Sequence, residues 1–166
     1  MYATKPISHD SVEAALAKVE RYRLLNEPGE AESICRDILE IEPENQAALI
    51  SLVLSLTDQI PESQNAFRLA LTTVGRLQTQ YDRAYYAGIA WERRAKARHN
   101  GSVQSAASHV YEWIVNALEL FDKAESLRPP GNDDAILRWN ACVRFLERHK
   151  ELGPRVEEMA EPIVSE

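Results

Sequence analysis

The stretch GEAESICRDILEIEPEN, residues 29–45, decides how this chain folds. Its apolar residues recur every three or four positions, which is the period of one face of an α-helix. The members of that face are Ala31, Ile34, Cys35, Ile38, Leu39 and Ile41. Pro43 ends the helix because proline has no N–H to donate and clashes with the preceding turn. A second apolar run starts at once, so we interpret the stretch as the second helix of a helical hairpin followed by another helix.

Proline, glycine and asparagine divide the rest of the chain in the same way. Helices are expected at about 11–25, 30–42, 46–58, 62–78, 80–99, 103–127 and 133–150, the first with Ser11 as a candidate N-cap. The alternating β-branched pattern of strands is almost absent, so the predicted fold is all-α. Connections this short place consecutive helices against each other as antiparallel hairpins.

Two of the predicted helices share one pattern. Cys35, Ile38, Ile41 and Pro43 follow Ala31 by the same numbers of residues as Phe121, Ala124, Leu127 and Pro129 follow Ala117. Each set combines a small residue for close helix approach, an apolar stripe and a proline stop. The shared proline makes a chance match less common and indicates a repeat.

These residues resemble the second helix of a tetratricopeptide repeat, a 34-residue helix-turn-helix unit that ends in proline. From Val12 to Asn45 the chain fits one repeat without a gap, and Gly88 with Trp91 resembles the first-helix pattern of another. Tyr22, Ala31 and Pro43 match the family pattern, whereas Ala15, Lys18, Val19, Asn26, Cys35 and Ile38 depart from it. Ala31 and Ala117 lie 86 residues apart, against about 68 for two repeat steps, so the later helices must be overlong.

The resemblance implies an α-solenoid of about three antiparallel hairpins and a C-terminal capping helix, a TPR-like superhelix. We divide the chain into an N-terminal extension (1–10), a repeat domain (11–150) and an acidic C-terminal tail (151–166). The resemblance also implies that first helices line a groove for partner peptides. The corresponding residues here are Leu16, Glu20, Arg23, Ile50, Leu54, Tyr85, Tyr86, Ile89 and Arg93. Core packing is the competing explanation for each, and for Trp113 and Trp139 it is preferred.

Composition restricts the function classes. The formal net charge of −7 over 166 residues disfavours general nucleic-acid binding. No signal-peptide core is present at the N-terminus, and the apolar run at 47–56 is about half a membrane span, so a cytoplasmic protein without a membrane segment is expected. Cys35 and Cys142 are expected to be buried, reduced thiols.

No enzyme motif or cofactor-binding motif is found, so no catalytic residue, cofactor or metal is predicted. The four histidines are scattered, and His109 with Glu112 makes a lone His-x-x-Glu pair that is insufficient for a bundle metal site. Some relatives of the resembled family grip a terminal carboxylate with a Lys-Asn-Asn-Lys-Arg clamp. Leu16 and Glu20 stand at two of those positions, so that clamp is absent.

We therefore expect a non-catalytic protein-interaction module, bacterial in its compactness, that binds a protein or peptide partner in the groove. Three alternatives stay open: a chaperone of a secretion system, a homo-oligomeric structural adaptor that pairs through its end hairpins, and an enzyme with an unrecognised site. The basic segment 92–99 is either a second binding patch or a solvated helix end.

Overall fold

The computed structural model describes residues 2–101 and 107–154, and within these ranges the chain is helical without any strand. A 3-10 turn at His9–Ser11 precedes the first α-helix. The α-helices are α1 (Val12–Leu24), α2 (Pro28–Ile41), α3 (Gln46–Asp58), α4 (Ala66–Val74), α5 (Gln80–Asn100), α6 (Ala107–Leu127) and α7 (Asp134–Arg148). The all-α prediction is confirmed.

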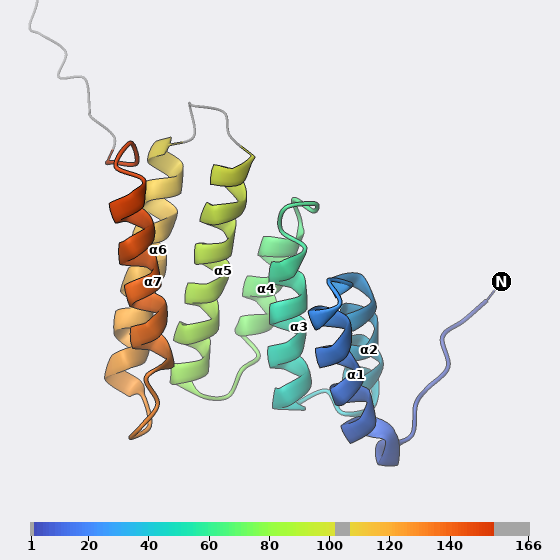
Figure 1. Cartoon of the computed structure of the whole chain (residues 1–166). Coiled ribbons are helices and arrows are strands. Elements are labelled where there is room, and N and C mark those ends of the chain that lie inside the picture. The colour runs from blue at the N-terminus through green and yellow to red at the C-terminus, as the bar shows by residue number, and fades with distance from the viewer. Residues whose placement is uncertain (1, 102–106, 155–166) are drawn as a thin grey trace, which may run out of the picture.

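The helices form a two-layered, solenoid-like stack (Figure 1). Helices α1, α3, α5 and α7 make the front layer, facing the viewer, and α2, α4 and α6 make the back layer. Each helix packs against its neighbours in the chain, and α3 also contacts α1 and α5, while α5 contacts α7. The chain is thus three antiparallel hairpins, α1–α2, α3–α4 and α5–α6, and α7 covers the end of the last one.

Local side-chain chemistry explains most helix ends. The side chain of Asn45 accepts a hydrogen bond of 2.9 Å from the N–H of Ala48, and the Thr79 hydroxyl accepts one of 2.9 Å from the N–H of Asp82. These caps start α3 and α5 by satisfying N–H groups that the helix leaves unpaired. Helix α2 begins at Pro28, two residues before the expected start, because proline suits the first helical position.

Three expected boundaries have different outcomes. Ser11 stands at the N-cap position of α1, as predicted, but its hydroxyl donates to the carbonyl of Ser8 at 2.8 Å and accepts no hydrogen bond from the helix. Helix α4 spans Ala66–Val74 rather than 62–78, since turns occupy the residues on both sides. The expected start of the sixth helix, at 103, lies outside the described residues.

The two helices that share the repeated pattern occupy equivalent positions. Ala31, Cys35 and Ile38 of α2 have no exposed surface, and the same is true of Ala117, Phe121 and Ala124 of α6. The α2 set belongs to a first core cluster, shared with α1, α3 and α4. Ala117 and Phe121 belong to a second, formed by α5, α6 and α7, and Ala124 lies in a small adjoining cluster with Ala84 and Ala135.

Gly88 allows α5 and α6 to pack closely in the third hairpin. A Cβ atom at this position would lie 2.6 Å from Cε1 of Phe121 on α6, closer than real Cβ contacts. The ring of Phe121 therefore occupies the space that a side chain on Gly88 would need. The glycine that resembled a first-helix signature thus has a packing role.

The folded body includes residues on both sides of the range 11–150. Ile7 packs against the first core cluster, and Leu152, only 8% exposed, belongs to the second. Residues 155–166 of the predicted acidic tail lie outside the described part of the chain. Among the described helices, none combines the length and the apolar character needed to cross a membrane.

Candidate partner-binding face

A depression on the front layer brings four of the predicted partner-binding residues together. It lies between α1 and α3 and has a volume of about 330 Å³. Its lining residues are Leu16, Ala17, Val19, Glu20, Arg23, Ala47, Ser51 and Leu54. Leu16 and Leu54 supply apolar surface, whereas Glu20 and Arg23 supply charge. Ile50, also predicted, is half-buried against the first core cluster and does not line the depression.

A second depression adjoins the first, because Glu20 and Arg23 line both. It has a volume of about 280 Å³ and adds Leu24, Asn26 and Asp58 to the surface. Leu24 is 82% exposed, so it offers apolar surface at the edge of this depression. Sequence reasoning missed Leu24 and Asp58 because neither stands at a groove position of the resembled family.

An ion-pair network ties α1, α3 and α5 together across this face. Arg23 Nε donates to Asp58 Oδ2 at 2.8 Å, and Arg93 donates to the other carboxylate oxygen of Asp58. Arg93 also donates to the Thr57 hydroxyl at 2.7 Å. Burial lowers the pKa of Arg93, and the carboxylate of Asp58 opposes that change. Both predicted arginines are thus fixed by a carboxylate that the prediction did not include.

A second network lies between α5 and α7. Glu92 is only 1% exposed, its Oε1 accepts from Lys96 Nζ at 2.5 Å, and its Oε2 lies 3.5 Å from Nη1 of Arg138. Burial alone lowers the pKa of Arg138, but the nearby Glu92 carboxylate helps to raise it above its ordinary value. Because a buried carboxylate is costly without a partner, the two cations stabilise Glu92 in this position.

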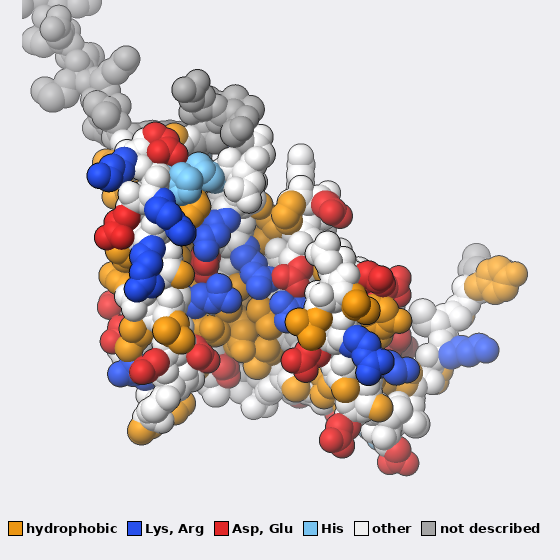
Figure 2. Space-filling model, in the orientation of Figure 1, with side chains coloured by type: hydrophobic (Ala, Val, Ile, Leu, Met, Phe, Trp, Pro, Cys, Tyr) orange, Lys and Arg blue, Asp and Glu red, His pale blue; other side chains and the backbone are white. Residues whose placement is uncertain are grey.

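Each network holds two cations and one carboxylate. Arg23 and Arg93 share Asp58, and Lys96 and Arg138 share Glu92. Together they carry a formal charge of +2 within a chain of net charge −7. Figure 2 shows where these charges lie: Lys and Arg side chains gather over α5 and α7, beside an apolar hollow next to α3. The two networks are therefore locally cationic, while Glu20 adds a negative charge to the partly apolar depressions beside the first of them.

The tyrosines of α5 are more deeply packed than a groove-lining position implies. Tyr85 lies edge-on to Tyr86, with ring centroids 5.1 Å apart, and stacks on Tyr81 at 5.7 Å. Tyr86 packs against both core clusters, and its burial raises the pKa of its hydroxyl to about 12. Ile89 is 2% exposed and supports the face from beneath instead of lining it.

The basic segment 92–99 does not form one patch. Arg94 packs over the rings of Phe67 and Trp113, with its Cζ 4.2 and 4.1 Å from their centroids. Arg93 and Lys96 are engaged in the two networks of the front face. The cations of this segment therefore point to different neighbours around α5. Trp113 and Trp139 pack against the second core cluster, as expected for core residues.

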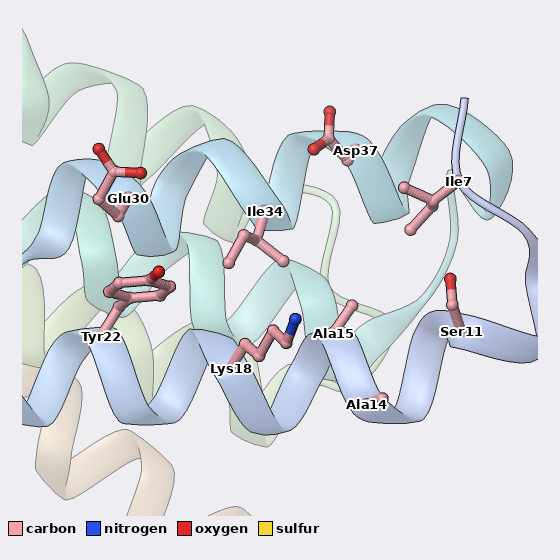
Figure 3. Close-up of a pocket in the computed structure, with 9 residues that line it drawn as sticks. All are labelled: Ile7, Ser11, Ala14, Ala15, Lys18, Tyr22, Glu30, Ile34 and Asp37. Carbon is pink, nitrogen blue, oxygen red and sulfur yellow. The ribbon is translucent and has the colours of Figure 1, made fainter. Parts of the chain in front are cut away.

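The outer side of the first hairpin carries a separate groove of about 380 Å³ between α1 and α2 (Figure 3). Ile34 of α2 and Tyr22 of α1 face each other across it, and Ile7 closes one end. Lys18, Glu30 and Asp37 supply charged side chains at its rim. This is the exposed end of the stack, where no further hairpin of the described residues packs.

Both cysteines are free and buried, as predicted. Burial raises the pKa of Cys35 and of Cys142 to about 12. Because the thiolate is the nucleophile, such thiols react slowly at neutral pH. Neither is therefore suited to act as a nucleophile in the folded protein.

No family model, curated protein or solved structure matches this chain.

Proposed function

We propose that this protein is a non-catalytic interaction module of the tetratricopeptide-like class, and that it binds a partner segment along the front face. The observation that carries the proposal is the pair of joined depressions between α1 and α3, which Arg23 and Asp58 of the first ion-pair network line. The second network lies farther along the front layer, between α5 and α7, and both networks carry excess positive charge. A partner segment with apolar and acidic side chains fits this surface best.

The apolar and the charged residues of the face have different expected roles in binding. Leu16, Leu24 and Leu54 offer apolar area, whose burial by a partner gives most of the binding free energy. The excess cations attract acidic side chains and set the orientation of the segment. Arg23 is held at 2.8 Å from Asp58, so its guanidinium is already positioned before a partner arrives.

The layering also supports the proposal. In the family that the sequence resembles, first helices line the peptide-binding groove, and here the first helices α1, α3 and α5 share the front layer with α7. The resemblance supplies the class of function, whereas the depression and its charges supply the place and the chemistry.

Affinity capture from the native cell, followed by mass spectrometry, tests the proposal. We expect one main partner whose retention weakens as salt is raised, because salt screens the exposed charges. Leu16→Glu should remove that partner, since it places a carboxylate on the apolar floor. Leu127→Glu is the matched control, because Leu127 is 39% exposed at the end of α6 in the back layer. Equal retention by both variants would contradict the proposal.

A second candidate function is a homo-oligomeric adaptor that pairs through its first hairpin. The groove between α1 and α2 favours it, because Ile7, Tyr22 and Ile34 present apolar surface at the open end of the stack (Figure 3). Sedimentation analysis over a concentration range tests this candidate. A mass that doubles with concentration, and that Ile34→Glu returns to the monomer value, would support it.

A further inference from the structure

Two histidines and a carboxylate meet where α5 and α7 end. His99 lies in the last turn of α5, His149 directly follows α7, and Glu151 is in the turn beyond it. One donor atom from each of the three residues lies within 4.8 Å of the other two. Because His99 and His149 are 50 residues apart, no local spacing in the sequence reveals this cluster.

The cluster is held by packing and is open to solvent. His149 Nδ1 lies 3.2 Å from Glu151 Oε1, and the ring centroids of His99 and His149 are 4.2 Å apart. Both rings pack against Phe145, with centroid distances of 5.4 and 4.6 Å. Phe145 is itself 6% exposed, so it gives the two imidazoles a fixed support. The Glu151 side chain is 61% exposed, which leaves a path for an ion.

We propose that His99, His149 and Glu151 form a binding site for a divalent transition-metal ion of the zinc class. Two imidazole nitrogens and one carboxylate oxygen are a common zinc donor set, whereas magnesium and calcium prefer oxygen donors. With zinc–donor bonds of about 2.0–2.1 Å, tetrahedral donors lie about 3.4 Å apart. The His149–Glu151 distance already matches this separation, and small side-chain rotations bring His99 into range.

The site is independent of the proposed partner-binding role. None of its three residues lines the depressions of the front face, and Lys96, whose Nζ lies 5.7 Å from the centroid of the Phe145 ring, is paired with Glu92 at 2.5 Å. An ion bound here joins the C-terminal end of α5 to the C-terminal end of α7. Because a ligand that binds only the folded state stabilises it, metal binding should hold α7 on the stack.

Isothermal titration calorimetry of the full chain with zinc chloride at neutral pH tests the proposal, after treatment with a chelator and its removal. We expect one ion per chain and a higher melting temperature with zinc. His99→Ala, His149→Ala and Glu151→Gln should each weaken binding at least about tenfold. The control is His9→Ala, since His9 Nδ1 lies 3.1 Å from Glu42 Oε1 and forms an imidazole–carboxylate pair without a second histidine.

Glu151→Gln keeps the test decisive if the histidine variants lose stability, because its side chain is mostly exposed and contributes little packing. Cobalt(II) in place of zinc supplies a second readout, and we expect the spectrum of nitrogen and oxygen donors. The proposal is overturned if the wild-type chain binds no zinc, if Glu151→Gln binds as tightly as wild type, or if cobalt shows the charge-transfer band of a thiolate ligand.

Discussion

The first and third hairpins place large and small residues at two equivalent buried positions in opposite order. In the third, Gly88 leaves room on α5 for the ring of Phe121 on α6. In the first, Val19 on α1 stands three residues before Tyr22, as Gly88 stands three residues before Trp91, and the position equivalent to Phe121 is Cys35. Val19 and Cys35 are 1% and 0% exposed. A large residue on one helix therefore accompanies a small residue on the other in both hairpins.

The two hairpins also differ on the front face. The first exposes Glu20 and leaves Leu16 half-buried beside a depression, whereas the third uses Tyr86 to join the two core clusters. We infer that the first hairpin contributes more to partner binding and the third more to the stability of the stack. The predictions below test these two differences.

The largest effect is expected for Phe121→Ala. Removing a fully buried ring from the third hairpin leaves a cavity beside Gly88, and we expect a loss of about 3–5 kcal/mol in the free energy of unfolding. Cys35→Ala removes only a sulfur atom at the equivalent position and should cost about 1 kcal/mol. Denaturant unfolding measures both. Equal losses of unfolding free energy would show that the size of the buried residue does not distinguish the two positions.

Gly88→Ala should cost about 2 kcal/mol, because the added Cβ overlaps the Phe121 ring. The double variant Gly88→Val, Phe121→Cys transfers the first hairpin's pair to the third. We expect it to unfold at a higher denaturant concentration than the sum of the single changes predicts, since the two positions share one space. Strict additivity in a double-mutant cycle would contradict a shared packing site.

Tyr86→Ala should lower the free energy of unfolding by about 1.5 kcal/mol, because the side chain packs against both core clusters. Leu16→Ala should cost less than half as much. For partner affinity we expect the reverse order, with the larger loss for Leu16→Ala. Thermal unfolding and a binding titration on the same two variants separate these effects.

The smallest expected effect concerns the two thiols. A thiol reagent should label both cysteines of the folded chain slowly. An unfolded thiol ionises near pH 9.0, whereas burial raises the pKa of Cys35 and Cys142 to about 12. Between these values only the unfolded state gains negative charge. The contribution of the thiols to stability is therefore full below pH 9.0 and is lost as pH rises toward 12. Rapid labelling of the folded protein at neutral pH would contradict this burial.

Local patterns were sufficient to predict the architecture. The apolar face ending at Pro43 predicted α2, and the offsets from Ala31 and Ala117 predicted two helices that bury the same three positions, although Leu127 at the end of the second pattern is 39% exposed. Helix α4 was predicted too long, because residues 62–65 and 75–78 on its two sides were included in it. Periodicity identifies a face, but it does not show where neighbouring turns end a helix.

The candidate face was harder to predict because it depends on pairing across helices. Asp58 is the shared partner of Arg23 and Arg93, yet it lies 35 residues from each. Arg138 pairs with Glu92 in the same way, across α5 and α7. Helical periodicity assigns a side chain to a face of its own helix and contains no information on partners this distant.

The central claim is that a partner segment binds along the front face, where apolar residues are buried and the excess positive charge attracts and orients the segment. The most direct test compares the dissociation constant of the main captured partner for Arg23→Gln, Arg138→Gln with that for Arg36→Gln, Arg68→Gln, two arginines of the back layer. Both double variants remove two positive charges, and the first leaves Asp58 paired with Arg93 and Glu92 paired with Lys96. We predict at least about tenfold weaker binding for the front-face variant and unchanged binding for the back-layer variant. Unchanged binding by the front-face variant, or an equal loss in both variants, would contradict the claim.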